Sequence, residues 1–237
     1  MGPDVDLSSV TIKPRGAGFC PALFNFRVEL FSYLLRSLSL QMASNAGQLS
    51  PLRGVTRHIT GHNAEGKAVI HSSNAGQWES LDESSMAFNV VYTSQFPADL
   101  NNDADLRAHE KVQQSEHMGL VNPGGTVCRI VDFAPNNTAV VHRTQSLDYG
   151  VVLEGQIELI LEEGEPTLMH RGDVAVQRAT MHGWRNPSET EWARMLFVLQ
   201  DCQKLTVAGK EMGEELGIAT GIIPPSGNSQ PKESSSL

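Results

Sequence analysis

VVHRTQSLDYGVVLEGQIELILEEGEPTLMHRGDVAVQRATMHGWRN, residues 140–186, is the stretch that decides the fold. Runs rich in valine, isoleucine and leucine are separated in it by glycine-containing turns at 163–165 and 171–173. That pattern predicts two β-hairpins. Each hairpin carries one histidine, His142 or His182, so a closed sheet would bring both imidazoles to the same interior.

The spacing of polar residues here resembles the first signature motif of the cupin superfamily, G(X)5HXH(X)3,4E(X)6G. His142 stands at the first histidine, Asp148 at the glutamate and Gly155 at the closing glycine. Thr144 occupies the place of the second histidine. The resemblance therefore implies the cupin fold, with one of the usual ligand positions replaced.

The second cupin motif, G(X)5PXG(X)2H(X)3N, is matched by Gly172, His182 and Asn186. Its interior differs, because Arg178 replaces the proline and Thr180 replaces the glycine. The gap before the histidine is also one residue short. The two motifs together cover about a fifth of the 237 residues.

Further strand-like segments flank this stretch, and turn residues recur at intervals of about ten positions. The segment 56–72 reads as a hairpin, and the segments 86–96, 125–133 and 191–199 read as single strands. Such a succession of short strands is typical of a small barrel or jelly roll. We therefore predict an all-β protein with one cupin-type antiparallel barrel over residues 56–206.

The two ends of the chain are predicted to be accessory to the barrel. Residues 1–55 are expected to form an N-terminal segment with some helix, and residues 207–237 are expected to hold a short helix at 209–216 and then a disordered tail. Residues 224–237 are rich in proline, serine and glycine, which is typical of disorder. Three charges within 19–40 make that apolar segment a poor membrane span, since each costs roughly 2.5–3.5 kcal/mol near a helix centre.

Composition narrows the class of partner. The net charge is −9, and no run of lysine and arginine occurs. We therefore expect neither a nucleic-acid partner nor an anionic membrane surface. A small hydrophobic substrate is expected instead, and a homodimer is left open. Three widely spaced cysteines suggest neither a disulfide framework nor a zinc knuckle, and favour a reducing, cytoplasmic location.

His142, Asp148 and His182 offer two imidazoles and one carboxylate. This set suits a divalent iron-like or zinc-like metal with open coordination positions. Asp148 and His182 are also the candidate catalytic residues, because a buried carboxylate beside a histidine can act as a general base. A metal-free polar pocket and purely structural histidines are the alternatives at this point.

Four more residues are candidates for contact with a substrate. Thr144 lies two positions from His142, and Trp184 lies two positions from His182, so each shares a strand face with its histidine. Trp184 could offer a flat apolar wall, although an aromatic residue in a barrel is more often plain core. Tyr149 and Arg178 complete the set.

Sequence motifs for other chemistries are absent. The chain has no GxGxxG, no GxxxxGK[ST] and no GxSxG. A self-contained nicotinamide site, a P-loop and a serine nucleophile elbow are therefore not indicated. Electrons in any redox reaction would have to pass through a metal, dioxygen or an externally docked cofactor.

The sequence of residues 142–161 and 172–199 also resembles that of small single-cupin proteins of fungal polyketide gene clusters. Several of those proteins are assigned as oxidoreductases of salicylaldehyde-type pathways. This resemblance implies a cupin oxidoreductase acting on a polyketide-derived alcohol or aldehyde. Two further hypotheses stay open. One is a metal-independent lyase, isomerase or cyclase that uses Asp148 and His182, and the other is a non-catalytic barrel that binds a hydrophobic metabolite.

Overall fold

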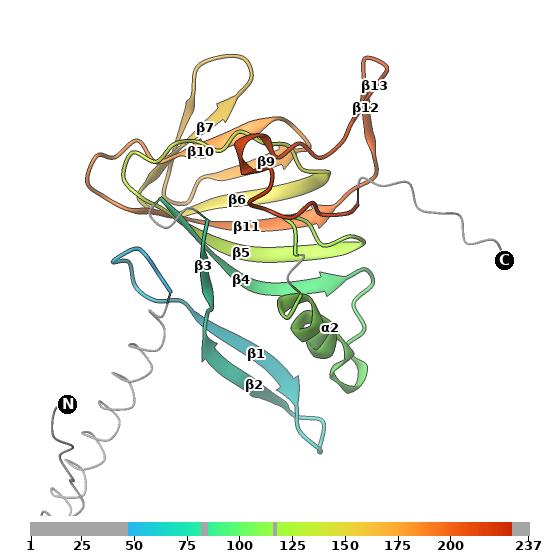
Figure 1. Ribbon diagram of the computed structural model, residues 1–237. Coiled ribbons are helices and arrows are strands. Elements are labelled where there is room, and N and C mark those ends of the chain that lie inside the picture. The colour runs from blue at the N-terminus through green and yellow to red at the C-terminus, as the bar shows by residue number, and fades with distance from the viewer. Residues whose placement is uncertain (1–46, 82–84, 116–117, 229–237) are drawn as a thin grey trace, which may run out of the picture. The chain divides into compact units, whose positions relative to one another are not determined.

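The computed structural model describes residues 47–81, 85–115 and 118–228, and every structural statement below concerns these residues. Strands dominate the part of the chain described (Figure 1). Those of the two largest sheets are β3 (Trp78–Ser80), β4 (Met86–Gln95), β5 (Gly125–Phe133), β6 (Ser146–Glu154), β7 (Gln156–Leu161), β8 (Thr167–His170), β9 (Val174–Arg178), β10 (His182–Arg185) and β11 (Ala193–Asp201). The strands predicted over 86–96, 125–133 and 191–199 are thus confirmed.

Two sheets enclose the main core. The larger has the strand order β3-β4-β5-β11-β6-β9, and the smaller has the order β10-β7-β8. Inward-facing residues alternate with outward-facing ones along these strands, as a sheet with one buried face requires. The core cluster joins residues of both sheets, among them Val131, Val152 and Met195 from the larger and Ile157 and Met169 from the smaller. The all-β prediction is confirmed.

The second predicted hairpin is wrong in its pairing. Residues 163–165 do turn within the β7–β8 hairpin, but 171–173 connect β8 of the small sheet to β9 of the large one. Gly172 donates its N–H to the carbonyl of Val152, and Val152 donates to the carbonyl of Asp173. The turn is therefore bonded to β6, and β9 pairs with that strand instead of with β8. Local turn residues show that a chain reverses but not which sheet it enters.

The hairpin predicted over 56–72 is confirmed as β1 (Thr56–His62) and β2 (Ala68–Ala75). It forms a two-stranded sheet of its own and contributes no strand to the two large sheets, which begin at Trp78. Most of β2 is exposed, so the hairpin buries too little apolar surface to serve as a barrel wall. The polar segment 98–117 contains one short helix, α2 (Ala104–Gln113), preceded by the 3₁₀ turn η1 (Asn101–Asp103).

The C-terminal segment corrects two predictions. The helix expected at 209–216 is absent, because β12 (Leu205–Val207) and β13 (Lys210–Met212) form a hairpin there. Its two turn residues, Ala208 and Gly209, both have positive φ, as a tight hairpin turn requires. A short 3₁₀ turn, η2 (Gly217–Ala219), follows.

The tail expected to be disordered from Pro224 is ordered up to Asn228. Ser226 is 7% exposed, and its hydroxyl accepts a hydrogen bond from the N–H of Val121 at 3.0 Å. Asn228 donates to the carbonyl of Gln145 at 2.9 Å. These long-range partners explain the order, since composition alone carries no information about them. Residues 229–237, and nearly all of the accessory segment predicted at 1–55, lie outside the described residues.

A buried ion pair links β5 to β11 on the outer side of the large sheet. Arg194 donates to both oxygens of Asp132, at 2.5 and 2.7 Å, and to the carbonyl of Arg53 at 2.6 Å. Ser50 donates to the same carboxylate, and the guanidinium lies 5.2 Å from the ring centre of Trp78. Through these hydrogen bonds the ion pair holds residues 50–53 against the sheet.

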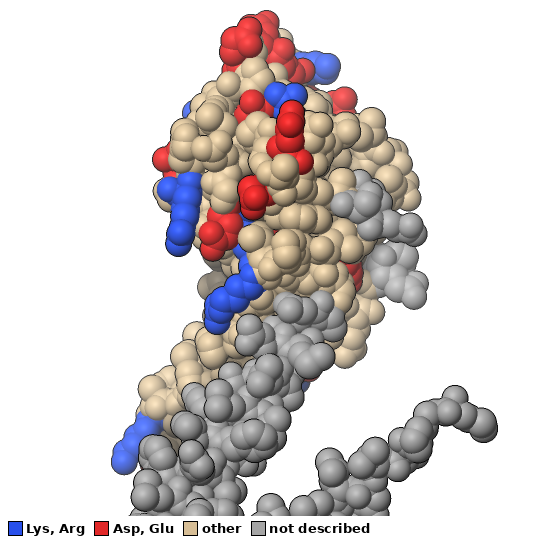
Figure 2. Space-filling model, turned by 90° about the vertical axis from the view of Figure 1, so that its left-hand side faces the viewer, with Lys and Arg blue, Asp and Glu red and all other residues tan. Residues whose placement is uncertain are grey.

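No helix in the described part of the chain is long and apolar enough to cross a membrane. On the face drawn in Figure 2, acidic and basic side chains are interspersed among neutral ones, and carboxylates gather at the top of that view.

We predict that Arg194→Met destabilises the protein by about 3–5 kcal/mol, because it leaves the carboxylate of Asp132 buried without its cation. The matched control is Arg185→Met, which breaks a half-exposed pair with Glu158 and should cost less than about 1 kcal/mol. Denaturant unfolding of both variants measures the difference. Equal losses would mean that the buried pair has no special structural role.

Candidate functional site

His142 and His182 form the centre of the site. Their backbones make an isolated antiparallel bridge in which each N–H donates to the other's carbonyl, both at 2.9 Å. Residues paired in this way project their side chains to the same face of the sheet. The ring centres lie 4.5 Å apart. The prediction that the fold brings both imidazoles together is confirmed.

Both imidazoles are anchored in the same way, through Nδ1. Nδ1 of His142 lies 2.9 Å from the carbonyl of Val140, and Nδ1 of His182 lies 3.0 Å from the carbonyl of Thr180. Because a carbonyl only accepts, Nδ1 carries the proton in each ring and Nε2 keeps its lone pair. Burial lowers the pKa of both histidines, that of His182 to about 4. The pair is therefore neutral at pH 7.

Asp148 reaches the same interior from β6. Gln177 on β9 donates to one of its carboxylate oxygens at 2.9 Å, while the other oxygen is buried and has no hydrogen-bond partner. Burial raises the pKa of this carboxyl to about 6, against the lowering effect of hydrogen bonding and of the nearby Arg129. Asp148 is thus an ionised acceptor at pH 7 with one oxygen available to a ligand.

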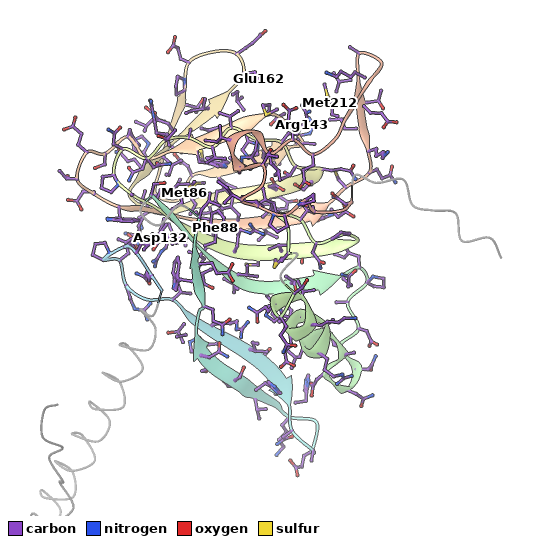
Figure 3. All side chains as sticks on the ribbon, viewed as in Figure 1. Met86, Phe88, Asp132, Arg143, Glu162 and Met212 are labelled. Carbon is purple, nitrogen blue, oxygen red and sulfur yellow. The ribbon has the colours of Figure 1, made fainter. Side chains whose placement is uncertain are left out.

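These three side chains line a cavity of about 70 Å³ that is otherwise mostly apolar. On that measure one water needs roughly 10–15 Å³, so the space corresponds to about five waters. Figure 3 shows Met86 and Phe88 on β4, which borders the cavity, with Glu162 far from them at the tip of the β7–β8 hairpin. The full lining is Leu81, Met86, Phe88, Leu120, Arg129, Val131, Phe133, Val140, His142, Asp148, His182, Trp184, Phe197, Leu199, Leu216, Ala219 and Ile223.

Two aromatic rings extend the histidine pair into a continuous wall. Trp184 shares the strand face of His182, and its ring meets that imidazole edge-on at 5.6 Å. Phe197 on β11 lies 5.3 Å from Trp184. Gly150 leaves the room for this ring, because a Cβ there would come within 3.0 Å of Phe197. The structure thus brings Trp184 to the cavity, as the sequence predicted.

Arg129 on β5 is the site residue that sequence reasoning missed. It is 5% exposed and lines the cavity. It stands opposite Phe197 on the inner face of the large sheet. Its position in the alternating strand 125–133 could have revealed a charged residue on the buried face, since Val127 and Val131 flank it on that face.

Three predicted contacts are not at the cavity. Tyr149 faces outward from β6 and is 42% exposed, and Arg178 is exposed on β9. Both predictions fail because consecutive residues of a strand point to opposite sides, and each is one position from an inward neighbour, Asp148 or Gln177. Thr144 is fully buried, but its hydroxyl is bonded to Ser146 at 2.7 Å and does not line the cavity.

The donor set fits a metal ion only in part. Nε2 of each histidine is free, with Nδ1 fixed by a carbonyl, which is how metal-binding histidines are usually oriented. Among the described residues, however, no group of three or more His, Cys, Asp and Glu side chains is close enough to hold a metal. The predicted set His142, Asp148 and His182 is therefore not assembled for coordination. Asp148 lies on the large sheet, where Gln177 of the same sheet binds it, while His182 lies on the small sheet.

Comparison with known proteins agrees with the fold. Residues 129–199 match the family model for the Cupin domain. The phomopsin biosynthesis cluster protein D of Diaporthe leptostromiformis is 40% identical over 193 residues, which is 79% of this chain and all of that protein. The cupin-domain-containing oxidoreductases virC of Hypocrea virens and fogC of Aspergillus ruber are 42% and 41% identical. They cover 66% and 71% of this chain, and this chain covers 80% and 83% of them.

We predict that stability falls as the pH is lowered from 7 to 5. The unfolded chain takes up protons on histidine near pH 6.5, whereas His182 and the helix residue His109, each with a folded pKa of about 4, resist protonation. Asp148 acts in the opposite direction, because its folded pKa of about 6 exceeds the unfolded value. Two histidines outweigh one carboxyl, and a net loss of roughly 2 kcal/mol is expected.

Denaturant unfolding at both pH values measures this dependence. Replacing the buried His109 by Gln should make it shallower, and Asp148→Asn should make it steeper by removing the opposing contribution. The exposed His58→Gln is the control and should leave the slope unchanged. A stability that increases towards pH 5 in the unsubstituted protein would contradict the assignment of neutral buried histidines.

Proposed function

The chain belongs to the cupin family, and on that premise we propose that it is an oxidoreductase acting on a polyketide-derived alcohol or aldehyde in fungal secondary metabolism. The relatives named as cupin-domain-containing oxidoreductases support the reaction class, and the relatives named for phomopsin and oryzines biosynthesis clusters support the setting. The observation that carries the proposal is the cavity itself, which combines apolar walls with a few converging polar groups.

The polar groups suit a substrate with a hydroxyl. Two neutral imidazoles and one carboxylate oxygen present lone pairs to the cavity, so an alcohol O–H finds acceptors there. Arg129 is the complementary donor and would suit the carbonyl of the corresponding aldehyde. The apolar remainder, with Trp184 and Phe197, would take the hydrocarbon part of the substrate.

In the proposed reaction Asp148 takes the proton from the substrate hydroxyl as general base, and the neutral imidazole of His182, which lines the same cavity, positions the reacting carbon. Oxidation breaks the O–H bond and one C–H bond and forms the carbonyl. Two electrons and the second hydrogen pass to an acceptor from outside the chain, either dioxygen or a docked nicotinamide. The reverse reaction would reduce the aldehyde.

Two alternatives use the same residues. A lyase, isomerase or cyclase needs only proton transfer, for which Asp148 and His182 would suffice without an electron acceptor. A non-catalytic barrel would use the cavity for binding alone. The names of the relatives favour the oxidoreductase over both alternatives.

The decisive experiment identifies the substrate by its accumulation. The gene is deleted in the producing organism, the accumulating compound is identified by mass, and it is fed to the purified protein with and without dioxygen, nicotinamide and ferrous iron. We expect a mass change of two hydrogens. His182→Ala and Asp148→Asn should each lower kcat/KM at least a hundredfold, within the range of general acid–base catalysis.

The matched control for these variants is Tyr149→Phe, which changes a polar residue beside Asp148 on the outer face and should leave the rate unaltered. Loss of water or carbon dioxide, or conversion without a mass change, would assign the protein to the lyase or isomerase class. If the compound binds tightly but is not converted under any of these conditions, the protein is assigned as a non-catalytic binding barrel. Elemental analysis of the active protein determines separately whether a metal takes part.

We also predict the pH dependence of the oxidation. Because the pKa of Asp148 is raised to about 6, the ionised base is lost as the pH falls through that value, and kcat/KM should fall about tenfold per pH unit below it. An Asp148→Glu variant with residual activity should show a displaced limb. A rate that is flat between pH 5 and 7 would exclude Asp148 as the base.

A further inference from the structure

Arg129 lies between two cavities. The inner one is the site described above, and the outer one has a volume of about 330 Å³ and a more polar lining that includes Glu79, Ser80 and Gln113. Five residues line both cavities and are called the neck: Leu81, Phe88, Leu120, Arg129 and Ile223. Arg129 is the one charged residue of this neck, so its guanidinium is next to any ligand that reaches from one cavity towards the other.

The guanidinium is held in place but not neutralised. Its Nη2 donates to the carbonyls of Leu120 at 2.8 Å and Gly119 at 3.3 Å, and it lies 5.7 Å from the ring centre of Phe88. Its Nε is buried and has no hydrogen-bond partner. Within the described residues no carboxylate comes within 4 Å of it, unlike the guanidinium of Arg194, which is paired with Asp132.

A buried cation without a counterion is costly, and folded proteins usually pair such charges. Asp148 and Glu79 act on Arg129 from the inner and outer cavities, but only through space. An anionic ligand would therefore gain a charge-assisted hydrogen bond from a donor that already stands desolvated and oriented. A neutral ligand oxygen could accept the same hydrogen bond but would leave the positive charge without a counterion.

We propose that Arg129 is a substrate-binding residue that selects compounds bearing an ionised oxygen, a carboxylate or an acidic phenol, and holds that oxygen at the neck. This inference rests on the proposed function and names its substrate class: an aromatic acid or acidic phenol whose alcohol or aldehyde carbon points towards His142 and His182.

The test uses three single-ring probes that differ in charge: benzoate, 4-nitrophenolate and benzyl alcohol. Their binding to the full-length protein is measured calorimetrically at pH 8, where both anions are ionised and Asp148 is deprotonated. We expect at least one anion to bind ten times more tightly than benzyl alcohol. The anion that does so distinguishes a carboxylate site from a phenolate site. Equal affinity for all three probes would overturn the proposal.

Substitution separates the charge of Arg129 from its structural role. Arg129→Met should remove the preference, so that the anions bind no more tightly than benzyl alcohol, while benzyl alcohol keeps its wild-type affinity. Arg178→Met is the matched control, since it removes an exposed arginine on the outer face and should preserve the preference. A preference that survives Arg129→Met would overturn the proposal.

If Arg129→Met does not fold, Arg129→Lys replaces it. Lysine keeps the charge but lacks Nε, so the anions should bind more weakly than to the wild type and still more tightly than benzyl alcohol. Wild-type affinity for the anions in this variant would count against a role for Nε.

The failures of the two proposals are distinct. Charge-selective binding without redox turnover refutes only the oxidoreductase, and turnover of a substrate without charge selectivity refutes only the role of Arg129.

Discussion

The pair of backbone hydrogen bonds between His142 and His182 is the constraint on which the site depends. It joins the segment before β6 to the small sheet, and it forces two imidazoles onto one face within 4.5 Å of each other. Two rings this close could not both be protonated in an apolar cavity, since neither charge would be solvated. The carbonyls of Val140 and Thr180 resolve the problem by fixing the proton on Nδ1 of each ring, which leaves two lone pairs directed elsewhere.

The cavity is completed by a segment that follows the last barrel strand. Leu216, Ala219 and Ile223 line it from the C-terminal side, and Arg143, one residue after His142, anchors that segment through reciprocal backbone hydrogen bonds and an ion pair with Glu215. Gly217 permits the close approach, because a Cβ there would come within 2.4 Å of the carbonyl of Val141. The anchor and the histidine bridge are thus adjacent in sequence. Any displacement of the C-terminal segment would alter both the cover of the cavity and the backbone that holds His142.

Sequence reasoning reached the fold and the central residues because both depend on local patterns. Alternating strands, glycine turns and the spacing of His142, Asp148 and His182 are visible in 140–186 alone. The predictions that were wrong have one physical origin: they depend on contacts with residues far away in the sequence, which a local pattern does not show. The turn at 171–173 changes sheet because its neighbours bond to Val152, and Ser226 is ordered because Val121 and Glu214 bind it. The sequence names Tyr149 and Arg178 as polar candidates but does not give the strand register that turns both outward. Arg129 is hidden in a mostly apolar strand, and its role depends on the cavity that the two sheets form.

The electrostatic balance of the cavity bears on which chemistry it can support. Its described lining contains one cation, one carboxylate and two neutral imidazoles, so the net charge is close to zero while Asp148 is ionised. Binding an anion beside Arg129 would make the cavity negative and would raise the pKa of Asp148 further, because the carboxyl would then share a desolvated space with a second negative charge. A stronger base results, but only after the substrate has bound. Arg129 lowers the pKa of Asp148, and an anion bound to Arg129 would weaken this effect. Substrate binding and the basicity of Asp148 are therefore coupled through one guanidinium. Proton transfer to Asp148 leaves the net charge of the cavity unchanged, but the second hydrogen then takes two electrons to the external acceptor and so removes one negative charge, which favours the oxidation in the complex.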